Sequence, residues 1–284
     1  MQIAARLIVA LIALSPALGA AQQPVPLPAG AKYVAMGSSF AAGVTITSSA
    51  DTPANRCRRS TDNYPHQIAR KHGLHLVDVS CGGATTAHLL GPWDELKPQL
   101  DAVDADTRLV TITVGGNDVG LSRGLAARGC RTAAATAPAA ASAETCDALP
   151  PLPTEKDWVE LETHLRQIAE EVHRRSPAAR VIFVDYTTIL PPTGTCPALS
   201  LTAQQADEGR SINQRVVEIT ARAARATGSE LVTASALTAD HHACAAAPWS
   251  AGFFGREPGM PAAFHPRLDA HTAIAQALDR LIWR

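Results

Sequence analysis

The stretch YVAMGSSFAAG at residues 33–43 reads as a buried strand that ends on a glycine and two adjacent serines. Its apolar first half is typical of a strand inside a sheet, and Gly37 lets the backbone turn sharply directly after it. Ser38 or Ser39 would then stand at the N-terminus of a helix with its hydroxyl facing a cleft. An ordinary serine helix cap explains the same residues, so the stretch alone does not decide between a cap and a reactive hydroxyl.

Segments of strand character alternate with segments of helical periodicity along the rest of the chain. Strands are expected at residues 32–36, 75–79, 108–114, 180–186 and around 230–233. Helices are expected at residues 63–72, 158–175, 203–226 and 268–283. This alternation predicts a three-layer α/β fold, with a central parallel five-stranded sheet covered on both faces and ligands bound beyond the carboxyl ends of its strands.

Glycine clusters follow the second and third expected strands. SCGGATT at 80–86 places two glycines where a backbone N–H can approach a ligand closely, although turn chemistry explains them equally well. VGGND at 114–118 would bring the amide of Asn117 to the end of the central strand, where it can donate to a developing oxyanion. A simple Asn-Asp turn is the alternative.

A candidate base lies in the sequence FHP at 264–266, just before the last expected helix. Acyl transfer by serine needs a nucleophile, a base and donors for the oxyanion, and a late loop is a suitable place for the base. Pro266 fixes the backbone directly after His265. The rival histidines are His66 and His72, where surface or capping roles are expected, and His271 inside the last helix.

The composition is that of an ordinary globular protein. The chain has 284 residues, of which 46% are hydrophobic and 18% are charged, with a formal net charge of −1. These values argue against disorder and against a nucleic-acid partner. No GxxxxGK phosphate-binding segment is present. We therefore expect no nucleotide chemistry.

The N-terminus has the pattern of a signal peptide. Arg6 precedes the apolar run at 7–14, and small residues follow at 17–21, so residues 1–21 are interpreted as a signal peptide cleaved near 19–22. A membrane anchor is the alternative, but the run is shorter than the roughly 20 residues of a spanning helix. We expect a secreted or periplasmic protein with no membrane span, made of a lead-in at 22–31 and a single domain at 32–284.

All six cysteines lie after the expected signal peptide, and an even number in an exported chain suggests three disulfides. Sequence alone leaves the pairing open. Cys130 and Cys146 bracket an alanine-rich stretch without periodicity, which favours a bridge that closes this loop. Its low-complexity part, 132–143, is expected to form a surface excursion.

Taken together, these motifs resemble the SGNH hydrolases, also called the GDSL esterase and lipase family. GSSFAAG, CRRSTDNYP at 57–65, DVSCGGATT at 78–86, VGGND and FHP occur in the order of the secreted, disulfide-bonded actinobacterial-type esterases. The resemblance spans roughly residues 32–283. It implies the flavodoxin-like fold of that family and hydrolysis of carboxylic esters, with phospholipase or carbohydrate deacetylase activity as the alternatives. With this resemblance we expect a monomer that needs no cofactor and acts on a small-molecule or lipid ester.

The resemblance also implies roles for individual residues. Ser39 is the expected nucleophile, His265 the base, and Gly83 and Asn117 join the Ser39 N–H as oxyanion donors; Gly82 leaves the register at Gly83 open by one residue. Bridges between neighbouring cysteines in the family imply the pairs Cys57–Cys81, Cys130–Cys146 and Cys196–Cys244.

The sequence departs from the family pattern at two positions. Ser38 replaces the usual aspartate of the GDS triplet, and Ala262 stands where most members carry the aspartate that orients the histidine. Some secreted relatives use a main-chain carbonyl there, which makes the carbonyl of Ala262 the expected orienter and Ser39–His265 a dyad. Asp269 and Asp240 are the alternative carboxylates.

Three rival functions fit the sequence less well. An α/β-hydrolase is disfavoured because its nucleophile elbow follows several strands, whereas Ser39 follows the first. A metal site around Asp240, His241, His242 and Cys244 is disfavoured because Cys244 is expected to be oxidised, so we expect no metal. An exported lipid- or carbohydrate-binding protein without turnover is the non-enzymatic alternative.

Overall fold

The computed structural model describes residues 26–136, 146–253 and 262–283. The expected signal peptide at 1–21 lies outside these residues. So do part of the lead-in and residues 137–143 of the alanine-rich stretch.

Five strands form one parallel sheet in the order β2-β1-β3-β4-β5. The strands are β1 (Lys32–Gly37), β2 (His75–Asp78), β3 (Thr107–Thr113), β4 (Arg180–Val184) and β5 (Glu230–Val232). The main helices are α2 (Tyr64–His72), α4 (Leu121–Thr136), α5 (Glu155–Arg175), α6 (Ala203–Ala226) and α8 (Leu268–Trp283). Shorter helical turns are α1 (Ser39–Ala42), α3 (Thr86–Leu90), η1 (Gln99–Ala102), η3 (Pro197–Leu199), α7 (Ala234–Leu237) and η4 (Ala239–His241).

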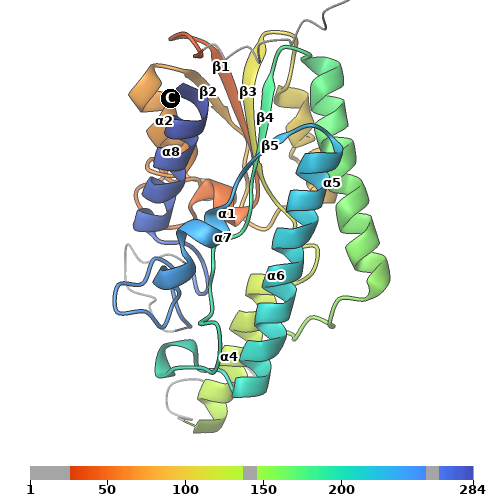
Figure 1. The fold of residues 1–284 in the computed structure, drawn as a ribbon. Helices are drawn as coiled ribbons and strands as arrows, with labels where there is room; N and C mark the ends of the chain where they lie inside the picture. The colour runs from red at the N-terminus through yellow and green to blue at the C-terminus, as the bar shows by residue number, and fades with distance from the viewer. Residues whose placement is uncertain (1–25, 137–145, 254–261, 284) are drawn as a thin grey trace, which may run out of the picture.

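Alternate residues of the central strands enter two separate cores. Val34 and Val110 face a core shared with α3, α4, α5 and α6, while Tyr33 and Leu109 face a second core shared with α2, α7 and α8. Figure 1 shows α2 and α8 on one side of the sheet and α4, α5 and α6 on the other. The expected three-layer architecture is confirmed, since strands buried on both faces need helices on both faces.

One expectation about local structure is wrong. Residues 132–136, expected in an irregular surface excursion, continue α4. Alanine has the highest helix propensity, so a run of alanine extends a helix although it offers no hydrophobic periodicity.

Three disulfides join Cys57–Cys81, Cys130–Cys146 and Cys196–Cys244, the pairs that the resemblance implies. Disulfides persist in oxidising compartments, so they suggest a protein exported from the cytoplasm. None of the helices within the described ranges is both long and apolar enough to cross a membrane.

Candidate active site

The turn after β1 places Ser39 at the start of α1. Gly37 has φ +145°, and a Cβ atom at this position would lie 2.3 Å from the carbonyl oxygen of Thr113 on β3. The N–H of Ser38 donates to that same carbonyl at 2.9 Å. Only glycine permits so close an approach of the two strands, and the turn that follows brings Ser39 to the carboxyl edge of the sheet.

His265 meets Ser39 at this edge. Its Nε2 lies 2.8 Å from the Oγ of Ser39, and its Nδ1 lies 2.8 Å from the carbonyl oxygen of Ala263. A carbonyl can only accept, so Nδ1 carries the proton and Nε2 is left to accept from the serine hydroxyl. The contact of Nδ1 corrects the expectation at Ala262, whose carbonyl instead accepts from the backbone N–H of His265.

The backbone around His265 explains why the carbonyl of Ala263, and not that of Ala262, meets the ring. Phe264 is fully buried and has φ +58°, in the left-handed region, which redirects the chain between Ala263 and His265. The segment 249–252 holds the turn in place: the N–H of Ala251 donates to His265 at 2.9 Å and the N–H of Phe264 donates to Gly252 at 3.3 Å. Strained residues of this kind persist where packing enforces them.

The imidazole of His265 is a weak base in the free protein. Burial lowers its pKa to about 4; the hydrogen bond to Ala263 opposes this shift, and the positive charge of Arg58 adds to it. A neutral carbonyl fixes the tautomer but supplies no full negative charge to stabilise the imidazolium. The ring is therefore neutral and able to accept a proton at neutral pH.

Two loops place the candidate oxyanion donors. Asn117 follows β3, and its Nδ2 donates to the carbonyl of Ala84 at 2.9 Å, which ties its side chain to the loop after β2. Gly83 in that loop has φ +91°, and a Cβ there would lie 3.3 Å from the Trp93 ring. Within the described residues, no acceptor is found for the N–H of Ser39 or of Gly83.

Asp118, which sequence reasoning did not single out, locks these two loops together. Its carboxylate accepts from the backbone N–H of Thr86 at 3.0 and 3.2 Å and from the Thr86 hydroxyl. The hydroxyl also lies 2.9 Å from Nδ1 of His164 on α5. Burial raises the pKa of Asp118. Its position directly after Asn117 is the signal that could have revealed this role.

Gln99 and Tyr186 hydrogen-bond to the segment around the turn after β1 that carries Ser38 and Ser39. Sequence reasoning identified neither residue. Gln99 accepts from the N–H of Gly37 at 2.7 Å and donates to its carbonyl at 3.0 Å. The hydroxyl of Tyr186 accepts from the N–H of Gly116 at 2.7 Å and lies 3.3 Å from the Oγ of Ser38. Ser38 is thus turned into the protein interior, with 1% of its surface exposed.

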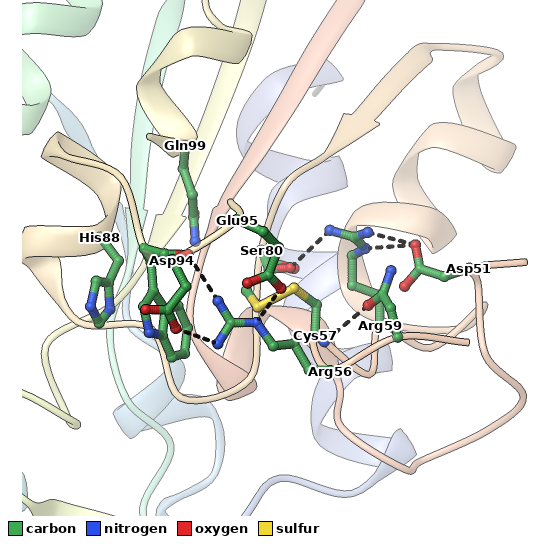
Figure 2. The surroundings of a disulfide bond; sticks show 12 residues. Asp51, Arg56, Cys57, Arg59, Ser80, His88, Asp94, Glu95 and Gln99 are labelled. Carbon is green, nitrogen blue, oxygen red and sulfur yellow. Dashed lines mark hydrogen bonds and ion pairs between the residues drawn. A yellow bond between two sulfur atoms is a disulfide. The ribbon is translucent and has the colours of Figure 1, made fainter. Parts of the chain in front are cut away.

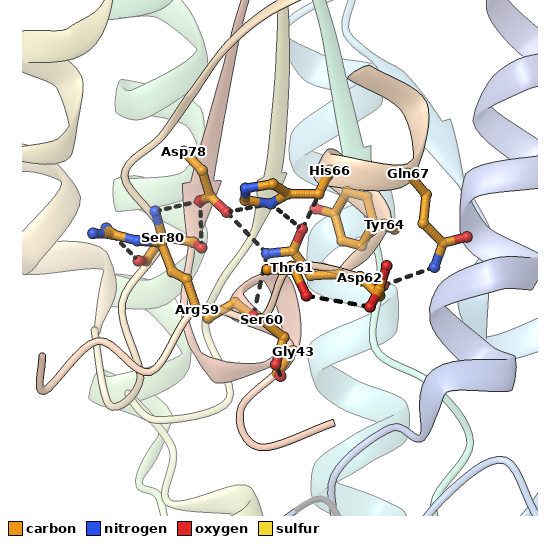
Figure 3. Close-up of polar contacts among 12 residues, drawn as sticks. Gly43, Arg59, Ser60, Thr61, Asp62, Tyr64, His66, Gln67, Asp78 and Ser80 are labelled. Carbon is orange, nitrogen blue, oxygen red and sulfur yellow. Dashed lines mark hydrogen bonds and ion pairs between the residues drawn. The ribbon is translucent and has the colours of Figure 1, made fainter. Parts of the chain in front are cut away.

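A buried polar network holds the loop at 57–65 against the serine helix. Asn63 donates through Nδ2 to Asp78 at 2.9 Å and to the carbonyl of Ala42, the last residue of α1, at 3.2 Å. Asp78 also accepts from the hydroxyl of Ser80 at 2.6 Å, and Figure 3 shows it between Ser80 and His66. The rival His66 is therefore engaged in this network and not with Ser39.

The family assignment follows from the comparison with known proteins. Residues 35–273 match the model of the GDSL-like Lipase/Acylhydrolase family. The chain belongs to this family. It is also 36% identical to Lipase 2 of Streptomyces coelicolor over 221 residues, which cover 75% of this chain and 73% of the relative. It is 29% identical to a Streptomyces rimosus lipase over 220 residues, which cover 76% and 75% of the two chains.

Two solved structures of Streptomyces enzymes have the same fold. The extracellular lipase of Streptomyces rimosus superposes with a TM-score of 0.67 at 24% identity, covering 88% of this chain and 99% of that one. Phospholipase A1 of Streptomyces albidoflavus gives a TM-score of 0.68 at 22% identity, covering 89% and 99%. With the family match and the identity to curated lipases, the chain is a carboxylic ester hydrolase.

Two of the residues considered for a metal site have other partners in the structure of this GDSL-family chain. Cys244 is bonded to Cys196, and His241 stacks on Trp249 with ring centroids 3.6 Å apart. No group of three or more metal-ligating side chains was found in the part of the chain that the structure describes.

Proposed function

We propose that this protein is an exported serine esterase or lipase that hydrolyses carboxylic esters through an acyl-enzyme on Ser39, with His265 as the base of a Ser–His dyad. The observation that carries the proposal is the continuous chain of hydrogen bonds from the Ser39 hydroxyl to Nε2, and from Nδ1 to the carbonyl of Ala263, each 2.8 Å long. In serine hydrolases a base activates the nucleophile and a third group orients the base; here a carbonyl takes the place of the usual carboxylate.

In the first half-reaction the Oγ of Ser39 attacks the ester carbonyl carbon while its proton passes to Nε2 of His265. The negative charge on the former carbonyl oxygen is stabilised by the N–H groups of Ser39 and Gly83 and by the amide of Asn117. The intermediate collapses by breaking the bond to the alcohol oxygen, which takes the proton from Nε2. Acylated Ser39 and free alcohol result.

In the second half-reaction His265 accepts a proton from water, whose oxygen attacks the acyl carbon. Collapse of this intermediate breaks the bond to Oγ, which recovers the proton from Nε2. The carboxylic acid leaves, and Ser39 is ready for another cycle. The proposal includes a cleaved signal peptide at 1–21, a single domain at 32–284 and a monomeric enzyme.

A chain-length series of p-nitrophenyl esters tests the proposed activity and its acyl preference. Wild type should hydrolyse at least the butyrate, Ser39→Ala should abolish turnover, and Ser38→Ala is the matched neighbouring control that should retain most of it. Folded wild-type protein without turnover on any ester would favour the binding-protein alternative. The reverse pattern of the two serine variants would contradict the assignment of Ser39.

A further inference from the structure

Trp93 lies against the loop at 80–86, which carries Gly83 and is called the candidate oxyanion loop below. A Cβ atom on Gly83 would lie 3.3 Å from Cη2 at the tip of the Trp93 ring. Apart from the chain neighbours of Gly83, no other described residue lies within 4 Å of that point. The Trp93 ring therefore bounds Gly83 on the side where any other residue would carry its side chain.

Hydrogen bonds fix both neighbours of Gly83 but leave its own N–H available. The N–H of Gly82 donates to the carbonyl of Cys57 at 3.0 Å, and the N–H of Ala84 donates to the carbonyl of Cys81 at 3.0 Å. Of the two adjacent glycines, only Gly83 can therefore offer its N–H to an oxyanion. Glycine populates both signs of φ about equally well, so the direction of this N–H depends on what contacts the residue.

Stacking and backbone hydrogen bonds hold the Trp93 ring in place. The imidazole of His88 stacks on it with ring centroids 4.1 Å apart and planes 8° apart, and Cζ of Arg56 lies 4.1 Å from the ring centroid. A cation over an indole face is attracted by the electrons of the ring. Trp93 and Leu96 exchange two backbone hydrogen bonds of 2.9 Å, and Nη2 of Arg56 donates to the Trp93 carbonyl at 2.9 Å. The ring is therefore fixed both by its face and by its backbone.

Both stacking partners of the ring are themselves anchored. Arg56 forms ion pairs with Glu95 at 2.9 Å and with Asp94 at 3.3 Å, and Figure 2 shows these contacts beside a disulfide. Nδ1 of His88 accepts from the N–H of Thr85 at 3.0 Å, which ties the stack to the candidate oxyanion loop. Burial and the charge of Arg56 lower the pKa of His88, so the imidazole stays neutral beside the guanidinium.

We propose that Trp93 is a positioning residue for ester hydrolysis: its clamped ring holds Gly83 so that the Gly83 N–H points at the oxyanion formed when Ser39 attacks. This inference rests on the proposed ester hydrolysis at Ser39. A donor that is in place before the charge develops stabilises the transition state without any reorganisation of the loop. Trp93 acts through Gly83 and does not itself touch the reacting atoms.

Kinetics on p-nitrophenyl butyrate and inhibition by trifluoromethyl butyl ketone test the proposal. The hemiketal that this ketone forms with Ser39 carries an oxyanion, so its inhibition constant reports the oxyanion donors, which KM does not. Trp93→Ala should lower kcat by roughly 10- to 100-fold, because one donor is misplaced but not removed. It should raise the inhibition constant by a similar factor and leave KM nearly unchanged. Arg56→Gln, which loosens the clamp, should cause the same two changes with a smaller size.

Trp283→Ala is the matched control. Trp283 also stacks on a histidine, since its ring centroid lies 3.5 Å from that of His72, but it stands at the end of α8. Its replacement should leave kcat and the inhibition constant unchanged. Circular dichroism checks the folded state of each variant, and Arg56→Gln decides by the same criteria if Trp93→Ala does not fold.

An unchanged kcat in Trp93→Ala overturns the inference. A fall in kcat with an unchanged inhibition constant also overturns it, because a merely structural role reduces the fraction of active enzyme and not its affinity for the ketone. A rise in KM at unchanged kcat would mean that Trp93 binds the substrate, and this too would overturn the inference. Wild type that does not hydrolyse p-nitrophenyl butyrate would instead contradict the proposed function.

Discussion

Nε2 of His265 lies 2.8 Å from Oγ of Ser39, although 226 positions separate the two residues in the chain. β1 and α1 deliver the serine, and the loop before α8 delivers the histidine. The ring reaches this position with a backbone carbonyl, and not a carboxylate, at Nδ1.

No carboxylate should be needed to orient His265. Asp269→Asn and Asp240→Asn should each keep kcat within about threefold of wild type, because Nδ1 is already bonded to the carbonyl of Ala263. Steady-state kinetics on p-nitrophenyl butyrate make the measurement. A loss of about 10³-fold or more in either variant would restore a triad and contradict the dyad.

The pH dependence should report a histidine that is hard to protonate. Only neutral His265 can accept the serine proton, so kcat/KM should rise with pH through a pKa of about 4 and stay level around neutrality. Arg58→Gln removes a charge that lowers this pKa and should move the rise to higher pH. The profile is measured over the pH range in which the protein stays folded. The account would be contradicted if kcat/KM reached half of its plateau only at a pH at or above the usual histidine pKa of about 6.5.

Asn117 should act mainly in the transition state. Asn117→Ala removes one oxyanion donor and should lower kcat by about 10²- to 10³-fold, with little change in KM. The control is Asn213→Ala on α6, which should preserve kcat. A large rise in KM at unchanged kcat would show that Asn117 serves ground-state binding instead.

Gln99 should stabilise the turn that carries Ser39. Gln99→Leu keeps a similar volume but removes both hydrogen bonds to Gly37, so the free energy of unfolding should fall by about 1–3 kcal/mol and kcat should fall with it. Urea denaturation and steady-state kinetics provide the two readouts. Gln214→Leu, on the exposed side of α6, serves as the control. Unchanged stability and kcat in Gln99→Leu would contradict this role.

Much of the fold could be predicted because burial leaves a clear pattern. The helices at 203–226 and 268–283 agree with α6 and α8, since each has an apolar face at helical spacing. Local patterns alone do not give the strand order, because they carry no information on which strands pair; the observed order β2-β1-β3-β4-β5 is the flavodoxin-like order that the family resemblance implies. The helix over residues 132–136 could not be predicted from periodicity, because an alanine run has high helix propensity but no apolar face.

The candidate site was predictable where side-chain chemistry marks it. Ser39, Asn117 and His265 stand in short motifs, and the structure brings Ser39 and His265 into contact. The carbonyl at Nδ1 could not be assigned, because every residue has a carbonyl and the positive φ of Phe264 determines which one meets the ring. Gln99 was missed because a lone glutamine outside any motif carries no signal.

Covalent labelling with a serine-directed phosphonate tests the central claim most directly. The account predicts a single adduct by intact mass, which peptide mapping places on Ser39, with labelling abolished in Ser39→Ala and in His265→Ala and retained in Ser38→Ala. An adduct on Ser38, or folded wild-type protein that is not labelled, would contradict the assignment of Ser39 as the nucleophile activated by His265.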